Sequence, residues 1–369
     1  MKKRKTILIT GGCGFIGRHL TSYFLYQGYT VYVIDNLSIG IHPKYWLPPF
    51  LKLKQLGGGE LAGIDRKNNS QFFFLNEDII QFFHNTERNI HTKRNYGNWQ
   101  QFNYIIHLAA IIGGRSVIEK DPLKVGIDLA IDALFFNWLV RLPRAPKKVL
   151  FSSSSSAYPV GLQSSIKRQA LKERDISFLN DYIGKPDLTY GWSKLTGEYL
   201  SHIAAKQYGQ NIGIIRPFSG YGEDQDLSYP VPSLLSQIAQ QKNPVNVWGN
   251  GNQGRDFIHI SDCVRAYALL LKQETDKLIT SNLGSGKLTT FRELILLAAK
   301  IQGYNPAIKP LLDKPVGVQT RHADMKHSPL HKLGFRQLIA LKEGLTRVIT
   351  FMNIKNKDLA KLYESYYKH

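Results

Sequence analysis

The chain has 369 residues, and 43% of them are hydrophobic, which is enough for one large or two moderate globular domains with a continuous core. Its two cysteines, Cys13 and Cys263, exclude a disulfide framework and show no metal-binding spacing. We therefore expect two free thiols, no metal site and a reducing, cytoplasmic environment.

The formal net charge of +20 raises the question of a polyanionic partner. Lysines and arginines are scattered, however, without the long stripe of basic and aromatic residues that single-strand binders show. No apolar stretch reaches the roughly 18 residues of a membrane span, and the apolar run after the basic start is too short for a signal peptide. We expect a solvated basic surface, no specific nucleic-acid partner and no integral membrane segment.

Along the chain, short apolar runs typical of buried strands alternate with longer segments of helical period. The strands are expected at 6–10, 30–35, 104–109 and 148–152, and the helices at 15–27 and 123–142. Strand and helix in repetition predict an α/β fold in which helices cover both faces of a parallel sheet. The sequence therefore indicates a Rossmann-like, doubly wound parallel sheet.

Two stretches interrupt this rhythm. Residues 41–70 contain three prolines and the run Gly57–Gly59, so we expect an insertion within the first domain, and residues 86–101 are expected to form a second surface excursion. The last regular strand ends at Pro217, after which turn signals increase. We predict a Rossmann domain over residues 1–217 and a smaller α/β substrate-binding region over 218–369, with its last helix starting near Leu341.

The first strand leads directly into the motif GGCGFIG, which places Gly11, Gly14 and Gly17 at the start of a helix. Such glycines permit a tight turn and close backbone approach, and the helix N-terminus offers free N–H groups to a pyrophosphate. The next strand ends in Asp35, where a carboxylate can accept hydrogen bonds from the adenosine ribose and repel a 2′-phosphate. The pattern predicts an NAD site rather than an NADP site.

Further cofactor contacts are expected beside the glycine loop and at the ends of neighbouring strands. They are Phe15, Ile16, Asn36, Asp78, Ile79, Leu108, Ala109 and Ala110.

The segment TYGWSK places Tyr190 and Lys194 four residues apart, on one face of a predicted helix. A close ammonium stabilises a phenolate, and bringing a phenol to near neutrality requires about 4 kcal/mol of such stabilisation. Tyr190 could then act as a general base on a sugar hydroxyl while hydride leaves for the nicotinamide. The run FSSSSSAYP, at the end of the predicted strand 148–152, supplies a hydroxyl that could share the reacting oxygen with Tyr190.

Together with HLAA at 107–110, RPFSGYG at 216–222 and GNQGRDFIHISD at 251–262, these motifs occur in the order seen in extended short-chain dehydrogenases/reductases. The chain resembles their NAD-dependent nucleotide-sugar epimerase/dehydratase family over nearly its whole length. The resemblance implies that Ser154, Tyr190 and Lys194 are catalytic, with the register among the five serines open by one. It also implies that Tyr190 and Lys194 contact the cofactor, that a nucleotide-diphosphate sugar is the substrate, and that Ser154, Ser219, Arg255 and Arg321 bind it, Arg255 at the diphosphate.

Within this family, 4,6-dehydratases carry Asp-Glu where this chain has Ser155 and Ser156. The pieces IIGG at 111–114 and GVQTRHAD at 317–324 look more like GDP-mannose 3,5-epimerase and GDP-fucose synthase, but those enzymes use a cysteine in place of Ser156. C4 epimerisation through a transient 4-keto intermediate needs only the predicted triad and NAD, and is the reaction we expect.

Two enzymatic alternatives stay open, a nucleotide-4-keto-sugar reductase and a GDP-sugar-modifying enzyme. A dinucleotide-sensing binding protein is the non-enzymatic alternative, although such a protein would usually have lost the tyrosine or the lysine. Two helices of this family often build a four-helix bundle between subunits, and 123–142 and 187–208 are the candidates, so we expect a homodimer.

Overall fold

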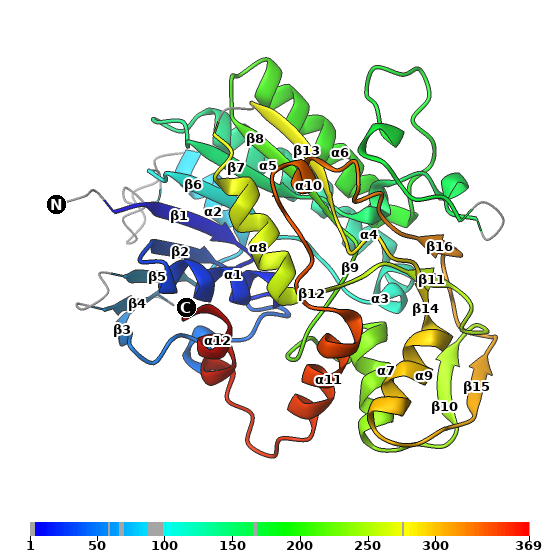
Figure 1. Ribbon diagram of the computed structural model, residues 1–369. Helices are drawn as coiled ribbons and strands as arrows, with labels where there is room; N and C mark the ends of the chain where they lie inside the picture. The colour runs from blue at the N-terminus through cyan, green and yellow to red at the C-terminus, as the bar shows by residue number, and fades with distance from the viewer. Residues whose placement is uncertain are drawn as a thin grey trace.

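The computed structural model describes residues 4–57, 60–65, 70–87, 99, 101–164, 168–274 and 277–368. Its largest element is a nine-stranded sheet with the strand order β13-β8-β7-β6-β1-β2-β5-β4-β3 (Figure 1). The strands are β1 (Thr6–Thr10), β2 (Thr30–Ile34), β3 (Lys52–Gly57), β4 (Glu60–Ile64), β5 (Gln71–Leu75), β6 (Tyr104–His107), β7 (Lys148–Ser152), β8 (Ile212–Pro217) and β13 (Leu278–Leu283). The strands from β13 to β5 all pair in parallel.

Both faces of the parallel strands are buried, which explains their nearly continuous apolar sequences. In β1, Ile7 and Ile9 belong to one hydrophobic core and Leu8 belongs to the other. The first core is covered by α1 (Phe15–Tyr26) and α8 (Ile260–Leu271), and the second by α2 (Ile79–Glu87), α5 (Asp128–Val140) and α6 (Leu188–Lys206). The predicted Rossmann-like, doubly wound fold is confirmed.

The expected insertion at 41–70 contains two further strands. β3 and β4 form an antiparallel hairpin that pairs with β5 and extends the sheet at that edge, while the proline-rich part contains the short 3-10 turn η1 (Pro43–Tyr45). The sheet is therefore mixed at its end rather than wholly parallel as the sequence suggested. The second expected excursion, 86–101, lies largely outside the described residues.

A smaller region, in green to orange in Figure 1, packs around its own apolar core. Its helices are α7 (Pro230–Ala239), α9 (Phe291–Ile301) and α11 (Leu341–Met352), and its strands are β9 (Ser219–Tyr221), β10 (Val245–Trp248), β11 (Gly254–Arg255), β12 (Phe257–His259), β14 (Thr289–Thr290), β15 (Ile308–Leu311) and β16 (Thr320–Arg321). Three short helices pack on the first domain instead: α3 (Arg115–Lys120) and α4 (Pro122–Gly126) against α6, and α10 (Pro329–Lys332) against β13. Both α8 and β13 follow residue 217 yet belong to the large sheet and its covering layer, so the chain crosses the expected boundary more than once.

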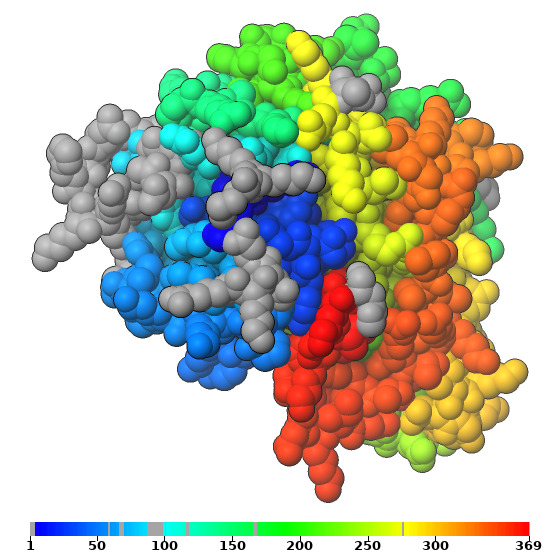
Figure 2. All heavy atoms as spheres, turned by 60° about the vertical axis from the view of Figure 1, so that its left-hand side comes forward, coloured from blue at the N-terminus to red at the C-terminus, as the bar shows by residue number. Residues whose placement is uncertain are grey.

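One helix lies beyond the last one expected from the sequence. α12 (Leu359–Tyr367) packs on α1, and Figure 2 shows the C-terminal segment in red against the N-terminal residues in blue. Its buried tyrosines, Tyr363 and Tyr367, stand four residues apart on one helical face, which is the spacing that could have predicted this helix. Within the described ranges, no helix is long and apolar enough to cross a bilayer.

Candidate active site

The glycine loop between β1 and α1 has the shape that close backbone approach requires. Gly11 has a φ of +67°, and a Cβ on Gly17 would lie only 2.4 Å from the carbonyl oxygen of Gly11. Helix α1 begins after Gly14 without a side-chain cap, so its first N–H groups stay available. This cradle fits an anionic pyrophosphate at a helix N-terminus.

Asp35, at the end of β2, organises the outer side of this loop. Its Oδ2 accepts the backbone N–H of Cys13 at 2.9 Å, and its Oδ1 accepts that of Leu37 at 2.8 Å. Burial raises the pKa of Asp35, while these N–H groups act to lower it. Nearby, the Asn36 side chain donates to Oδ2 of Asp78 at 3.2 Å, which brings the residues predicted for the adenosine end together.

A cavity of about 330 Å³ opens beside the glycine loop. Its lining includes the predicted residues Gly11, Gly14, Phe15, Ile16, Gly17, Leu108, Ala110, Ser154, Tyr190, Lys194, Ser219, Arg255 and Arg321. Ala109 lies behind the loop, where its N–H donates to Thr10 Oγ1 at 3.3 Å, and Ile79 is buried at the start of α2. Neither Ala109 nor Ile79 is among the residues that line this cavity.

Tyr190 and Lys194 lie on successive turns of α6, as predicted, with Lys194 Nζ 5.7 Å from the centroid of the Tyr190 ring. Burial raises the pKa of Tyr190; the Lys194 ammonium and a hydrogen bond with the Ser154 side chain act to lower it but do not overcome burial. Lys194 and Ser154 therefore lower the pKa of Tyr190 by less than burial raises it.

The five serines after β7 have separate surroundings. Ser152 is in hydrogen-bond contact with Tyr267 at 2.6 Å, Ser153 donates to the buried carboxylate of Glu198, and Ser155 is buried in the 3-10 turn η3 (Ser155–Ala157). Ser154, by contrast, reaches Tyr190 in the cleft. This arrangement supports the predicted register, with Ser154 rather than Ser153 at the reacting centre.

Glu198 also anchors Arg216, whose Nη2 lies 2.6 Å from its Oε2. Both side chains are buried at this contact, which gives Arg216 a structural role.

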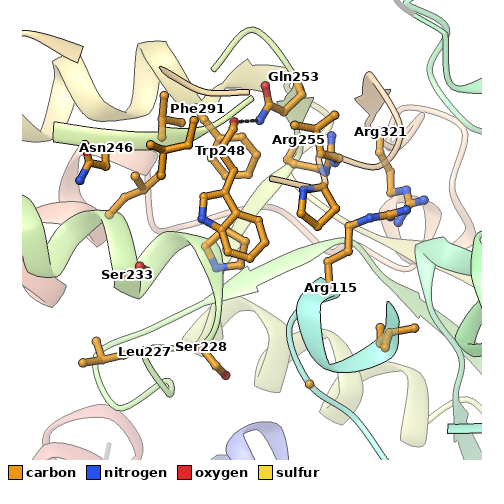
Figure 3. A pocket seen from close by; sticks show the side chains of 18 of the residues that line it. Arg115, Leu227, Ser228, Ser233, Asn246, Trp248, Gln253, Arg255, Phe291 and Arg321 are labelled. Carbon is orange, nitrogen blue, oxygen red and sulfur yellow. Dashed lines mark hydrogen bonds between the residues drawn. The ribbon is translucent and has the colours of Figure 1, made fainter. Parts of the chain in front are cut away.

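A second cavity, of about 570 Å³, adjoins the first between the sheet and the smaller region. Tyr190, Ser156, Arg255 and Arg321 line both cavities. Figure 3 shows Arg115, Arg255 and Arg321 together at one end and Trp248 and Asn246 toward the other. The side chain of Gln253 holds the Trp248 backbone by donating to its carbonyl oxygen at 2.6 Å.

The three arginines differ in their partners. Arg321 pairs with Asp187 at 2.6 Å, and Arg115 contacts the same carboxylate at 3.3 Å. The guanidinium of Arg255 donates only to backbone carbonyls, those of Gly254, Val318 and Val316, and no acidic partner is found for it among the described residues. Burial and the Arg321 charge lower the pKa of Arg255 to about 9, and an anion bound beside it would favour its charged form.

Sequence reasoning missed Arg115, Asp187 and Trp248. The signal for Arg115 was its position just after Gly113 and Gly114, close behind the strand end that carries the predicted cofactor contacts. Asp187 and Trp248 stand in segments that gave no sign of facing the same cavity, because only the packing of the smaller region brings them together.

Comparisons with known proteins agree with this geometry. The sequence profile of the NAD dependent epimerase/dehydratase family matches residues 7–45 and 50–284. A putative UDP-glucose 4-epimerase of Methanocaldococcus jannaschii is 25% identical over 95% of this chain and 99% of its own length. A UDP-glucuronate 4-epimerase of Thermodesulfobacterium geofontis is 26% identical over 96% of this chain and 98% of its own length.

The fold is also similar to that of a UDP-glucose 4-epimerase of Thermus thermophilus, solved in complex with NAD. The TM-score is 0.74 at 20% identity, and the match covers 95% of this chain and all of that one (100%). The family resemblance carried by the motifs is thereby confirmed, and NAD is the cofactor. The chain is an enzyme and belongs to the NAD dependent epimerase/dehydratase family.

Proposed function

We propose that the chain inverts C4 of a nucleotide-diphosphate sugar by way of a transient 4-keto intermediate. The observation that carries this proposal is the position of Tyr190, which lies in the wall shared by the cavity beside the glycine loop and the larger cavity beyond it. A sugar in the larger cavity and a nicotinamide in the smaller one would both be within reach of this side chain.

The residues proposed to hold NAD are the glycine loop, Asp35 and Lys194. NAD, when bound, supplies a hydride acceptor and, after reduction, a hydride donor. Tyr190 would take the proton from the C4 hydroxyl as that carbon is oxidised, and would return it to the same oxygen as the ketone is reduced. Ser154 would hold the reacting oxygen in place by a hydrogen bond.

In the larger cavity, Arg255 would bind the diphosphate, since it is the arginine without a carboxylate partner there. Arg321, which lines both cavities, and Ser219, which lines the one beside the glycine loop, would bind other parts of the substrate. Trp248 offers a flat face to the base. The volume of about 570 Å³ is within the usual range of small-molecule sites, and the keto sugar would have to turn within it to present its other face.

The sugar end holds few groups able to move a second proton. Burial acts to raise the pKa of Asp187, but Arg321 and Arg115 outweigh it and lower the value, so this carboxylate stays ionised in its ion pairs. Ser155 and Ser156 stand where dehydratases carry an acid and a base. This arrangement favours C4 chemistry over dehydration and over 3,5-epimerisation.

We also propose a homodimer built through α4, α5 and α6. Apolar side chains are exposed on these helices, namely Leu123, Leu129, Trp192 and Tyr199. Trp192 and Tyr199 stand seven residues apart and so share a helical face, which suits a four-helix bundle between two subunits. A cytoplasmic location is proposed from the two free, buried cysteines.

The test is incubation of the purified protein with UDP-, GDP-, CDP- and dTDP-sugars, with and without added NAD, followed by NMR of the products. UDP-sugars are tested first, because the relatives from Methanocaldococcus jannaschii and Thermodesulfobacterium geofontis are named as 4-epimerases of UDP-sugars. A C4-inverted sugar without net change in the cofactor is the expected result. Stoichiometric oxidation of NADH by a 4-keto sugar would establish a reductase instead, and no turnover on any sugar would contradict the proposal.

A further inference from the structure

Two buried carboxylates, Asp128 and Asp132, lie one turn apart on α5, behind the proposed catalytic residues. Asp128 is 0% exposed and Asp132 is 1% exposed. Asp128 Oδ1 accepts the backbone N–H of Ile111 at 2.6 Å, and Asp132 Oδ1 is 3.2 Å from Nε2 of His107. The second oxygen of each carboxylate is buried without a hydrogen-bond partner in the described part of the chain.

The unpartnered oxygen of Asp132 faces α6. A Cβ on Gly197 would lie 2.6 Å from Oδ2 of Asp132, and Gly197 stands three residues after Lys194 on the same helix. Because α5 and α6 each follow a strand of the parallel sheet, they run in the same direction and pack side by side. Asp128, one turn before Asp132, therefore lies at the level of Lys194, closer to the cleft.

The electrostatics agree with this placement. Burial acts to lower the pKa of Lys194, but Asp132, Tyr190 and Asp128 outweigh it and raise the value. Burial raises the pKa of Asp128 to about 6, with Lys194 and the Ile111 N–H acting to lower it. Both carboxylates also act to raise the pKa of Tyr190.

A buried, unpaired carboxylate oxygen costs several kcal/mol unless a charge nearby offsets it. Lys194 can offset one of the two carboxylates, and Asp132 is also in hydrogen-bond contact with His107. Asp128 therefore adds a second negative charge near Tyr190, which a cation entering the cleft would offset. The oxidised nicotinamide ring is such a cation.

We propose that Asp128 is a positioning residue that keeps Lys194 an ammonium and holds the proton on Tyr190 until oxidised NAD is bound. This inference rests on the proposed function, because it assigns Tyr190 the role of proton carrier. Its consequence is that Tyr190 is protonated whenever the cofactor is absent or reduced, which is the state needed to return a proton to a ketone oxygen.

The test titrates Tyr190 itself, with no sugar present. The full chain is labelled isotopically at tyrosine, and its NMR spectrum is followed with and without NAD. The Tyr190 resonance is assigned as the one that is absent from the spectrum of Tyr190→Phe. In Asp128→Asn, which keeps an acceptor for the Ile111 N–H, we expect the Tyr190 pKa to fall by about 1 unit, as for a charge removed several ångströms away. The groups facing Asp128 that titrate with it are Lys194, Tyr190 and Asp132, the last in contact with His107.

Asp121→Asn is the matched control, since Asp121 is an exposed cap of α4 and should leave the Tyr190 pKa unchanged. Should Asp128→Asn fold poorly, Asp128→Ser removes the same charge and should shift the value in the same direction. An unchanged or raised Tyr190 pKa in the neutral variants would overturn the inference, even in an active epimerase. A lowered value in a protein that turns over no sugar would contradict the proposed function and leave the inference standing.

Discussion

Arg321 donates a hydrogen bond to the hydroxyl of Ser156 at 3.1 Å, across 165 residues of chain. The same guanidinium holds Asp187 at 2.6 Å, so β16 of the smaller region is tied to the serine loop and to the start of α6. The wall at the sugar end is thus fixed by charge-assisted bonds between segments distant in sequence.

Tyr190→Phe should lower kcat by two to four orders of magnitude, the usual contribution of a positioned proton carrier. NAD affinity should stay within a few-fold, because the ring and its packing are kept. Turnover by NMR and NAD binding by calorimetry check both statements, with Tyr208→Phe, an exposed tyrosine beyond the end of α6, as the control. Retained turnover in Tyr190→Phe would remove the proposed proton carrier.

The serine register can be tested with two neighbouring variants. Ser154→Ala should lower kcat by roughly two orders of magnitude, the size of effect seen when one donor to a reacting oxygen is lost, with little change in stability. Ser153→Ala should cost about 1–3 kcal/mol of unfolding free energy, because it leaves buried Glu198 short of a hydrogen bond. Denaturant unfolding and kinetics on both variants decide the register; the reverse pattern would move the catalytic role to Ser153.

Asp35→Ala should weaken NAD binding by roughly 10- to 150-fold, as expected for the loss of 1.5–3 kcal/mol from a hydrogen bond to a charged group. The affinity for NADP should fall by less, since the carboxylate that repels its 2′-phosphate is removed. The measurement is the ratio of the two dissociation constants. Asp78→Ala, whose carboxylate contacts Asn36, should change NAD affinity without changing this ratio.

Much of the first domain was predictable because local signals and the global fold agree there. The glycine loop, Asp35 and the alternation of Ile7, Leu8 and Ile9 between two cores each follow from a few neighbouring residues. The edge hairpin of β3 and β4 was not predictable in this way. Every residue of β3 is exposed, so its sequence carries no periodic apolar signal.

The larger cavity was harder to predict for a different reason. Arg255 and Arg321 could be named through the family resemblance, but the motifs do not tell which arginine lacks a carboxylate partner. That distinction depends on Asp187, which lies just before α6 and forms an ion pair with Arg321 on β16. Pairings across such sequence distances are fixed by tertiary packing, and no local pattern encodes them.

Arg255→Ala should raise KM for the nucleotide sugar by at least tenfold, since a charged hydrogen bond to phosphate contributes about 1.5–3 kcal/mol. The dissociation constant for NAD should change little if the diphosphate of the sugar is the partner. Steady-state kinetics and NAD binding separate the two ligands, and Arg292→Ala, an exposed arginine on α9, is the control. An unchanged KM would place the diphosphate elsewhere in the cavity.

The buried ion pairs of Asp224 predict how the unfolding free energy should depend on pH. It lies between Arg18 and His19, at 2.7 Å and 2.8 Å, and also accepts a hydrogen bond from Tyr363 of α12. Burial acts to raise the pKa of Asp224, but His19 and Arg18 outweigh it and hold the value well below its usual range. A depressed pKa contributes stability that is present above the unfolded value, about 3.9, and is lost as the pH falls below it.

The wild-type chain should therefore lose unfolding free energy as the pH drops below about 4. Asp224→Asn should be less stable at neutral pH by about 3–5 kcal/mol, the usual cost of breaking a buried ion pair, and the gap to the wild type should narrow in acid. Urea unfolding at a series of pH values measures both, with Asp313→Asn as an exposed control. If the difference in unfolding free energy between the wild type and Asp224→Asn stays constant with pH, the packing of α12 rather than the charge of Asp224 stabilises this region.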